Sequence, residues 1–302
     1  MYLKLIKTFL VVFTLGNLSS LFSQGCSDAG VCTFNPSSFS TEPIKEKNKI
    51  VLLAGSNGVG EQNINSSQII MAYEHVFDKF KLNIKSIYQL QNGEVSIRGF
   101  GDLFILGSYA INNQLNLNSA LKIPFNGGDL EYDGVGLPMA YQTSLGTFDI
   151  LAGVCYNIKG LSVTLATQIP VTQNNNTFLS SHSDTTEKWA TLPSSNNFKR
   201  KADILFDSKY GFDNLMNDLV LAPGFNLIYH IGNDSYDDAI GNTVEHTGSQ
   251  GATINLTLNA SYKISESLQV TFLLGTPQVT RDIRPEGLTR RYVISLGLKQ
   301  SF

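Results

Sequence analysis

The most regular feature of the sequence is an alternation of apolar and polar side chains that recurs many times after residue 48. Between Ile254 and Ile264 every second residue is apolar, and Asn, Thr, Ser and Lys occupy the positions between them. The same alternation occurs in 115–123, in 161–169 and from Tyr292 to Phe302. A period of two residues places apolar side chains on one face of a β-strand and polar side chains on the other. The pattern therefore predicts an all-β chain.

Twelve segments carry this signal, and the lengths of their connections alternate. The predicted strands cover 49–58, 67–76, 81–90, 101–111, 114–124, 147–158, 161–170, 199–210, 218–230, 252–264, 267–276 and 289–302. Short connections (77–80, 112–113, 159–160, 211–217 and 265–266) alternate with longer ones (59–66, 91–100, 125–146, 171–198, 231–251 and 277–288). Outer-membrane barrels combine short periplasmic turns with long outer loops and an even number of strands. We therefore expect an antiparallel transmembrane β-barrel of about 12 strands.

Both ends of the sequence fit this interpretation. Lys4 and Lys7 precede an apolar run over 9–15, a pattern typical of a secretory signal peptide. We expect a signal peptide over 1–23, a short periplasmic or plug segment over 24–48 and the barrel over 49–302. Phe302 ends an alternating segment, as in terminal strands that the barrel-assembly machinery recognises, so we expect it to be an assembly signal. The predicted location is the outer membrane of a Gram-negative bacterium.

Composition and charge exclude several other classes of protein. With 42% hydrophobic residues and a formal net charge of -3, the chain has neither the composition of a disordered protein nor the basic character of one that binds nucleic acid. Three cysteines are too few for a large disulfide scaffold. In an oxidising compartment we expect a disulfide between Cys26 and Cys32, and a free, shielded thiol at Cys155.

One stretch resembles a known family. The sequence Gly-Phe-Gly-Asp-Leu-Phe-Ile-Leu-Gly-Ser-Tyr at 99–109 is followed by Leu-Lys-Ile-Pro at 121–124, Leu-Pro at 137–138 and Ser-Leu-Gly-Thr-Phe-Asp-Ile-Leu-Ala-Gly at 144–153. These motifs resemble the outer-membrane proteins named for the MetA pathway of phenol degradation, which look like distant relatives of the FadL/TodX channels. The resemblance implies a barrel that passes apolar or aromatic molecules. Segment 24–48 is short for the plug of a FadL-type channel.

The strands predicted to line the lumen carry both apolar and charged residues, whereas the lumen of an ion or sugar porin should be uniformly polar. If the apolar stripes of each strand face lipid, other apolar residues and two carboxylates point inward. The candidates are Phe104, Leu106, Leu151, Leu205, Leu273, Asp203 and Asp207. They either contact an apolar solute, or fill a narrow lumen and contact the N-terminal segment.

The outer rim offers a second candidate site, for binding phosphate groups of lipopolysaccharide. Alternating strand direction places two basic clusters there, with Lys199, Arg200 and Lys201 in one and Arg290 and Arg291 in the other. Such side chains form charge-assisted hydrogen bonds to phosphate. A solvated loop edge is the competing interpretation.

No enzyme or metal site is predicted. A twelve-stranded phospholipase barrel needs a Ser two residues after a His on one strand, and none of the four histidines has one. The pairs His246 with Glu245 and His230 with Asp234 provide too few ligands for a tight metal site. We therefore expect no cofactor. The predicted function is passive uptake of small hydrophobic or aromatic compounds; a structural or adhesive barrel, a general porin and a soluble secreted β protein are the alternatives.

Overall fold

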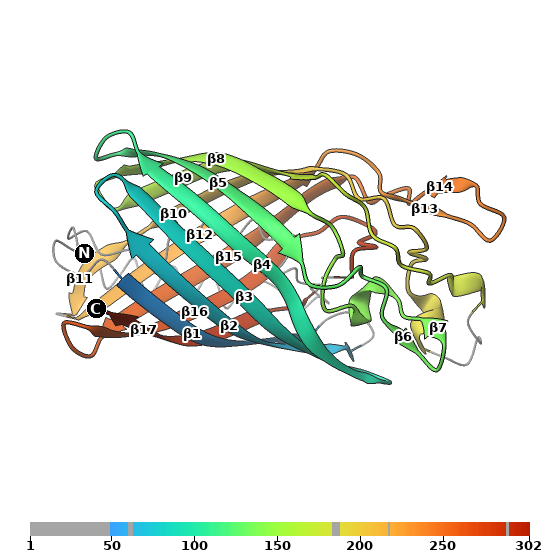
Figure 1. Ribbon diagram of the computed structural model, residues 1–302. Coiled ribbons are helices and arrows are strands. Elements are labelled where there is room, and N and C mark those ends of the chain that lie inside the picture. Colours follow the sequence, from blue (N-terminus) through green and yellow to red (C-terminus); the bar gives the residue numbers. More distant parts are fainter. Residues whose placement is uncertain (1–48, 60–62, 183–187, 217, 288–289) are drawn as a thin grey trace.

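The computed structural model describes residues 49–302 except 60–62, 183–187, 217 and 288–289. Twelve long antiparallel strands of the described chain form one closed barrel (Figure 1), which confirms the predicted fold. The strands are β1 (Lys49–Val59), β2 (Asn65–Val76), β3 (Phe80–Asn92), β4 (Ser96–Ala110), β5 (Leu115–Pro124), β8 (Asp149–Ile158), β9 (Leu161–Pro170), β10 (Asp203–Tyr210), β12 (Leu219–His230), β15 (Gly251–Lys263), β16 (Leu268–Val279) and β17 (Val293–Ser301). A short segment, β11 (Phe212–Met216), also pairs with β12.

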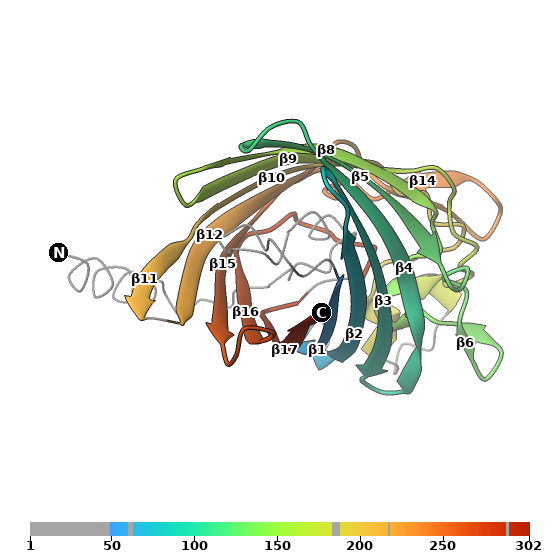
Figure 2. The ribbon, with the colours of Figure 1, turned by 60° about the vertical axis from the view of Figure 1, so that its left-hand side comes forward.

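The barrel closes between its first and last strands. Strand β1 pairs antiparallel with β17, from Ile50 opposite Ser301 to Asn57 opposite Ile294. On the far side of the ring, β10 pairs with both β9 and β12. Because lipid offers no hydrogen-bond partner to the backbone, a sheet that spans a membrane must be closed in this way. Figure 2 shows the strands enclosing the interior.

The outer face of the barrel is an apolar band between two belts of aromatic side chains. Leu53, Leu165 and Leu296 in the band are each more than half exposed. Exposed aromatic residues near one end are Phe77, Phe80, Tyr109, Tyr156, Tyr210 and Tyr262, and those near the other end are Phe100, Phe125, Tyr229 and Tyr292. From Phe100 to Tyr109 on β4, nine steps of about 3.3 Å on a strand tilted by about 40° rise about 23 Å. This matches the height of about 25 Å of a membrane-facing band.

The two ends of the barrel differ in their connections. One end, the turn end, carries the last residue and tight hairpins such as that between β8 and β9. The two residues of this hairpin, Lys159 and Gly160, have φ values of 45° and 85°. Positive φ at both central positions is the geometry that matches the twist of paired strands, and glycine adopts it without steric cost. The opposite end, the loop end, carries the long segments 125–148, 171–202, 231–250 and 280–292.

One predicted loop is wrong. The segment 91–100 was expected to be a long connection, but β3 continues to Asn92 and β4 begins at Ser96. Gln91 is buried beside Gln89, whose Nε2 donates a hydrogen bond to the Thr143 carbonyl at 2.6 Å, whereas Asn92, Ser96 and Arg98 are exposed. Alternation is a weak signal wherever a strand does not face lipid, since both faces can then be polar.

The long segments contain short elements that alternation did not predict. They are β6 (Glu131–Tyr132) paired with β7 (Val135–Gly136), β13 (Ser235–Asp237) paired with β14 (Thr243–Glu245), and the 3-10 turns η3 (Met139–Tyr141), η4 (Ser180–His182) and η5 (Lys188–Thr191). All of them lie at the loop end (Figure 1). No helix among the described residues is long and apolar enough to cross a membrane.

Candidate functional site

Apolar side chains gather on the inner face of one wall of the barrel. The inner patch, as we call it, consists of Leu106 on β4, Ala120 on β5, Leu151 on β8, Ala166 on β9, Leu205 on β10 and Ile228 on β12. Register explains the gathering, because Ala120 lies opposite Leu151, and Leu205 lies opposite both Ala166 and Ile228. Leu151 is fully buried, and Leu205 is 2% exposed. The patch is therefore a packed apolar surface inside the barrel.

The structure places the predicted inward-facing residues in different surroundings. Leu106, Leu151 and Leu205 belong to the inner patch. Phe104 is also buried, and the Lys85 ammonium lies 4.4 Å from the centre of its ring. Leu273 lies outside the patch on β16, opposite Asn259 and Ser295.

Sequence reasoning did not select Ala120, Ala166 or Ile228. Alternation from the lipid-facing neighbours Leu121, Leu165 and Leu227 would have indicated their inward direction. It could not have shown that they meet one another, because that depends on the register of strands distant in sequence.

A group of buried charged residues lies beside the inner patch, at the loop end of the same strands. The charged collar, as we call it, comprises Asp102, Lys122, Asp149, Arg200, Asp203, His230 and Asp234. Lys122 Nζ lies 3.1 Å from Asp149 Oδ2, and Arg200 contacts Asp149 at 3.4 Å. Buried charges are costly unless paired, and here each cation faces at least one carboxylate.

His230 extends the charged collar into the next loop. Its Nδ1 lies 2.6 Å from Asp203 Oδ1, and its Nε2 lies 2.8 Å from Asp234 Oδ1. Carboxylates at both ring nitrogens are satisfied together only by an imidazolium, which donates from both. Arg200 also forms an ion pair with Asp203. The collar thus joins strand residues to loops 171–202 and 231–250.

Of the two predicted inward carboxylates, Asp203 belongs to the charged collar. Asp207, four residues further along β10, forms a separate ion pair with Lys209 at 3.1 Å. A third cluster lies in loop 280–292, where Glu286 pairs with Arg281. Burial works to raise the pKa of the Glu286 carboxyl, but the nearby cations Arg281, His230 and Arg200 hold that pKa below its ordinary value.

Above the charged collar, the long segments pack into a folded cap. Its apolar cluster comprises Ile64, Val95, Leu137, Ala140, Tyr141, Phe178, Trp189 and Leu192. The buried side chain of Asn176 donates to the carbonyls of Gly128 (2.7 Å) and Leu137 (2.9 Å), which ties loop 171–202 to loop 125–148. Amide groups buried in this way make the two loops one structural unit.

The barrel is similar in fold to a solved outer-membrane channel. The COG4313 outer membrane channel from Pseudomonas putida F1 aligns with a TM-score of 0.56 and 13% identity, covering 88% of this chain and 99% of that one. The fold is that of an outer-membrane β-barrel. The NanC porin (TM-score 0.47, 10% identity, 83% and 98% covered) and the P. putida toluene transporter TodX (0.40, 9%, 88% and 92%) are less similar. No family model and no curated protein matches the sequence.

In this barrel, the predicted rim cations lie in three kinds of surroundings. Arg200 points into the charged collar, and Arg290 is 2% exposed and donates to Ser66 Oγ at 2.8 Å. Lys201 and Arg291 are exposed. Lys199 is part-exposed and bonds to Asp237 Oδ1 at 2.6 Å, and that bond is the main cause of the lowered pKa of the Asp237 carboxyl. Contact with lipopolysaccharide stays a prediction, and it now concerns Lys201 and Arg291 above all.

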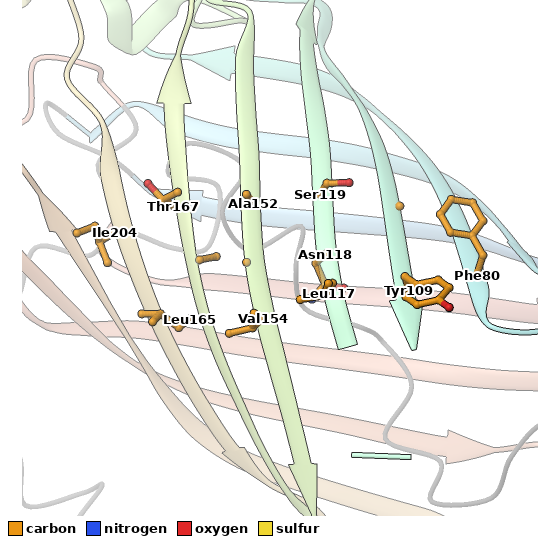
Figure 3. A pocket seen from close by; sticks show the side chains of 13 residues that line it. Phe80, Tyr109, Leu117, Asn118, Ser119, Ala152, Val154, Leu165, Thr167 and Ile204 are labelled. Carbon is orange, nitrogen blue, oxygen red and sulfur yellow. The ribbon is translucent and has the colours of Figure 1, made fainter. Parts of the chain in front are cut away.

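The lipid-facing side of the wall that carries the inner patch has a shallow hollow of about 790 Å³. Figure 3 shows its lining. Small residues, including Gly107, Ser119 and Ala152, lie between larger exposed side chains such as Tyr109 and Leu165. The hollow is open and mostly apolar, so in the membrane its natural contents are lipid chains.

The remaining predictions concern cysteines and metals. Cys155 is a free, buried thiol on β8, whereas Cys26 and Cys32 lie outside the described residues, as do segments 1–23 and 24–48. In the described part of the chain, no group of three or more His, Cys, Asp and Glu side chains is arranged to hold a metal ion. His246, considered above with Glu245, instead bonds through Nε2 to the Ser194 carbonyl at 2.8 Å.

Proposed function

We propose that this chain is an outer-membrane channel for passive uptake of small hydrophobic or aromatic compounds, and that it has no enzymatic activity. The observation that carries the proposal is the inner patch. A lumen built for ions or sugars should be polar throughout, whereas here Leu151, Leu205 and Ile228 form an apolar surface on the inside of the wall. The similarity in fold to the COG4313 outer membrane channel supports a channel role.

The physics of the inner patch suits transient binding of an apolar solute. Removing apolar surface from water contributes about 25 cal/mol per Å², so a solute that buries about 100 Å² of its own apolar surface gains about 2.5 kcal/mol. That is enough to hold an apolar solute briefly and too little to trap it.

The folded cap favours a second candidate function, a structural or adhesive barrel. Its apolar cluster around Phe178 and Trp189 and the buried Asn176 make the outer loops an ordered surface. An ordered surface suits recognition of a partner outside the cell better than loose loops would.

Uptake by proteoliposomes tests both candidates. Vesicles carrying the wild-type barrel should take up a small aromatic hydrocarbon faster than empty vesicles, and Leu151→Asn with Leu205→Asn should remove the gain. Leu273→Asn is the matched control, because Leu273 is on the inner strand face of β16 but outside the inner patch. Heat-modifiable gel mobility verifies that each variant is folded.

The pattern of results separates the functions. Equal hydrocarbon uptake with and without protein, together with ready passage of ions or sugars, would identify a general porin. Passage of neither solute class would favour the structural barrel. A loss of uptake in Leu273→Asn as large as in the patch variants would show that the inner patch has no special role.

A further inference from the structure

The inner face of β15 carries buried polar atoms that have no hydrogen-bond partner among the described residues. Thr253, Asn255, Thr257 and Asn259 alternate along the strand, and the first three are at most 5% exposed. The atoms without a partner are Thr253 Oγ1, Asn255 Oδ1, Thr257 Oγ1 and Asn259 Nδ2. The other amide atom of Asn255, Nδ2, donates to Asn226 Oδ1 at 2.7 Å. We call this row the polar rail.

Four such atoms on one strand are unusual in a folded protein. Buried polar groups normally have partners, because an unpaired one loses its bonds to water without replacement. Valine or alanine would fill the same positions on β15 at no such cost. The rail therefore lacks partners in the described part of the chain, and water molecules or a polar group of a solute can supply them.

The polar rail adjoins the inner patch. Thr253 lies directly opposite Ile228 of the patch, and Ile228 lies directly opposite Leu205. Residues in register on neighbouring strands project on the same side of a sheet, about 5 Å apart. Figure 2 shows β12 and β15 side by side. An eight-stranded barrel is just wide enough for side chains to fill, so twelve strands leave room for a small molecule between the walls.

We propose that the polar rail and the inner patch form one two-sided site for small neutral compounds that combine an apolar body with a single hydroxyl or carbonyl group. This inference rests on the proposed function and narrows its solutes. The apolar body lies on the inner patch, and the polar group exchanges hydrogen bonds with Thr253 Oγ1, Asn255 Oδ1 or Thr257 Oγ1.

The chemistry of the rail selects the polar group. Its free atoms are hydroxyls, an amide oxygen and an amide nitrogen, which both donate and accept but carry no charge. The nearest carboxylate on the inner face of β10, Asp207, is already paired with Lys209. From Thr253 to Asn259 the rail extends over six residue-to-residue steps, about 20 Å along the strand. A solute can therefore move along the rail by replacing one hydrogen bond with the next.

Binding of two matched probes tests this site. The protein in lipid nanodiscs is titrated with 4-fluorobenzyl alcohol and with 4-fluorotoluene, and fluorine NMR measures the bound fraction, with empty nanodiscs as the blank. The double variant Thr253→Val with Thr257→Val keeps the side-chain shape and removes both hydroxyls. Thr276→Val is the matched control, since Thr276 lies opposite the lipid-facing Leu256 on the neighbouring strand.

We expect the double variant to bind the alcohol about tenfold more weakly, equivalent to about 1.4 kcal/mol, and to bind 4-fluorotoluene within twofold of wild type. The control should bind both probes as wild type does. The single variants Thr253→Val and Thr257→Val, each with about a threefold loss for the alcohol, give the same test if the double variant does not insert.

Four other outcomes overturn the proposal. Unchanged alcohol binding in the variants would show that the rail holds water only, and an equal loss for both probes would show a structural role. If wild type binds both probes equally and the variants change neither, the hydrophobic channel stands and the rail proposal fails. If wild type binds neither probe, both proposals fail together.

Discussion

The backbone N–H of Phe302 donates a hydrogen bond to the carbonyl of Lys49 at 2.9 Å, so the last residue joins the chain to the first residue of β1. The side chain of Phe302, in contrast, is 64% exposed and adds little packing at this seam. The two parts of the residue therefore have separable roles. The backbone closes the barrel, and the ring is free to act as a recognition element during assembly.

Two variants distinguish these roles. Deletion of Phe302 should lower the membrane-inserted fraction, because it removes both the seam bond and the ring. If the ring is the assembly signal, Phe302→Ala should lower insertion nearly as much, while Phe302→Tyr stays close to wild type. Heat-modifiable mobility of outer-membrane fractions measures the inserted fraction. Normal insertion of the alanine variant would restrict the role of Phe302 to its backbone.

The charged collar predicts a large effect from one loop residue. In Arg200→Ala, the carboxylates of Asp149 and Asp203 both lose the buried guanidinium as an ion-pair partner. Asp149 is then still paired with Lys122, and Asp203 with His230. Removing one member of a buried ion pair costs about 3 kcal/mol or more, so the midpoint of urea unfolding should fall clearly. Arg200→Lys keeps the charge and should recover part of the loss. An unchanged midpoint in Arg200→Ala would mean that the collar does not stabilise the loops.

The comparison of sequence with structure shows where alternation is informative. The strand from Ile254 to Tyr262 was predicted because lipid on one side imposes apolar residues at every second position. The collar could not be predicted, because Arg200 and Asp149 are 51 residues apart and meet only through the barrel's register. Gln91 was assigned to a loop because its strand is polar on the inner side there and extends beyond the apolar band. The sequence showed the polar rail as the polar face of β15. Only the structure shows that atoms of these side chains have no hydrogen-bond partner among the described residues.

Acid should loosen the cap through His246. Burial lowers the pKa of this imidazole below its ordinary value of 6.5, despite the carboxylates Asp234 and Glu286 nearby. The neutral ring donates from Nε2 to the Ser194 carbonyl, which holds loop 231–250 against loop 171–202. When the cap is open, the His246 imidazole takes up a proton below pH 6.5, but in the packed cap it binds this proton more weakly. The free energy that stabilises the packed cap is therefore lost as the pH falls from 6.5 toward the lowered pKa.

The single tryptophan of the chain reports this change, because Trp189 is buried in the apolar cluster of the cap. Its emission should shift to longer wavelength between about pH 8 and about pH 5, the range in which histidine titrates. His246→Gln keeps a donor for Ser194 and removes the titration, so its emission should change less. The same shift in both proteins would assign the acid sensitivity to other groups.

The last prediction concerns contact between the rim and lipopolysaccharide. Arg290 is 2% exposed and donates to Ser66, so it holds the loop to the barrel and is not available to a lipid. Lys201 and Arg291 are exposed at the loop end, and charge-assisted hydrogen bonds from such side chains to phosphate are strong. Replacing both by Ser should therefore reduce the lipopolysaccharide that co-purifies with the barrel and leave its unfolding midpoint unchanged.

Arg290→Ser serves as the contrasting variant for this test. It should lower the unfolding midpoint, because Ser66 loses its buried partner, while the amount of bound lipopolysaccharide per folded barrel stays the same. Quantifying lipid A phosphate in the folded fraction of each variant separates the two effects. Unchanged lipopolysaccharide in the Lys201 and Arg291 double variant would show that these two cations do not bind lipid A phosphate. Of the two predicted clusters, only Lys199 would then remain partly exposed, and it is paired with Asp237.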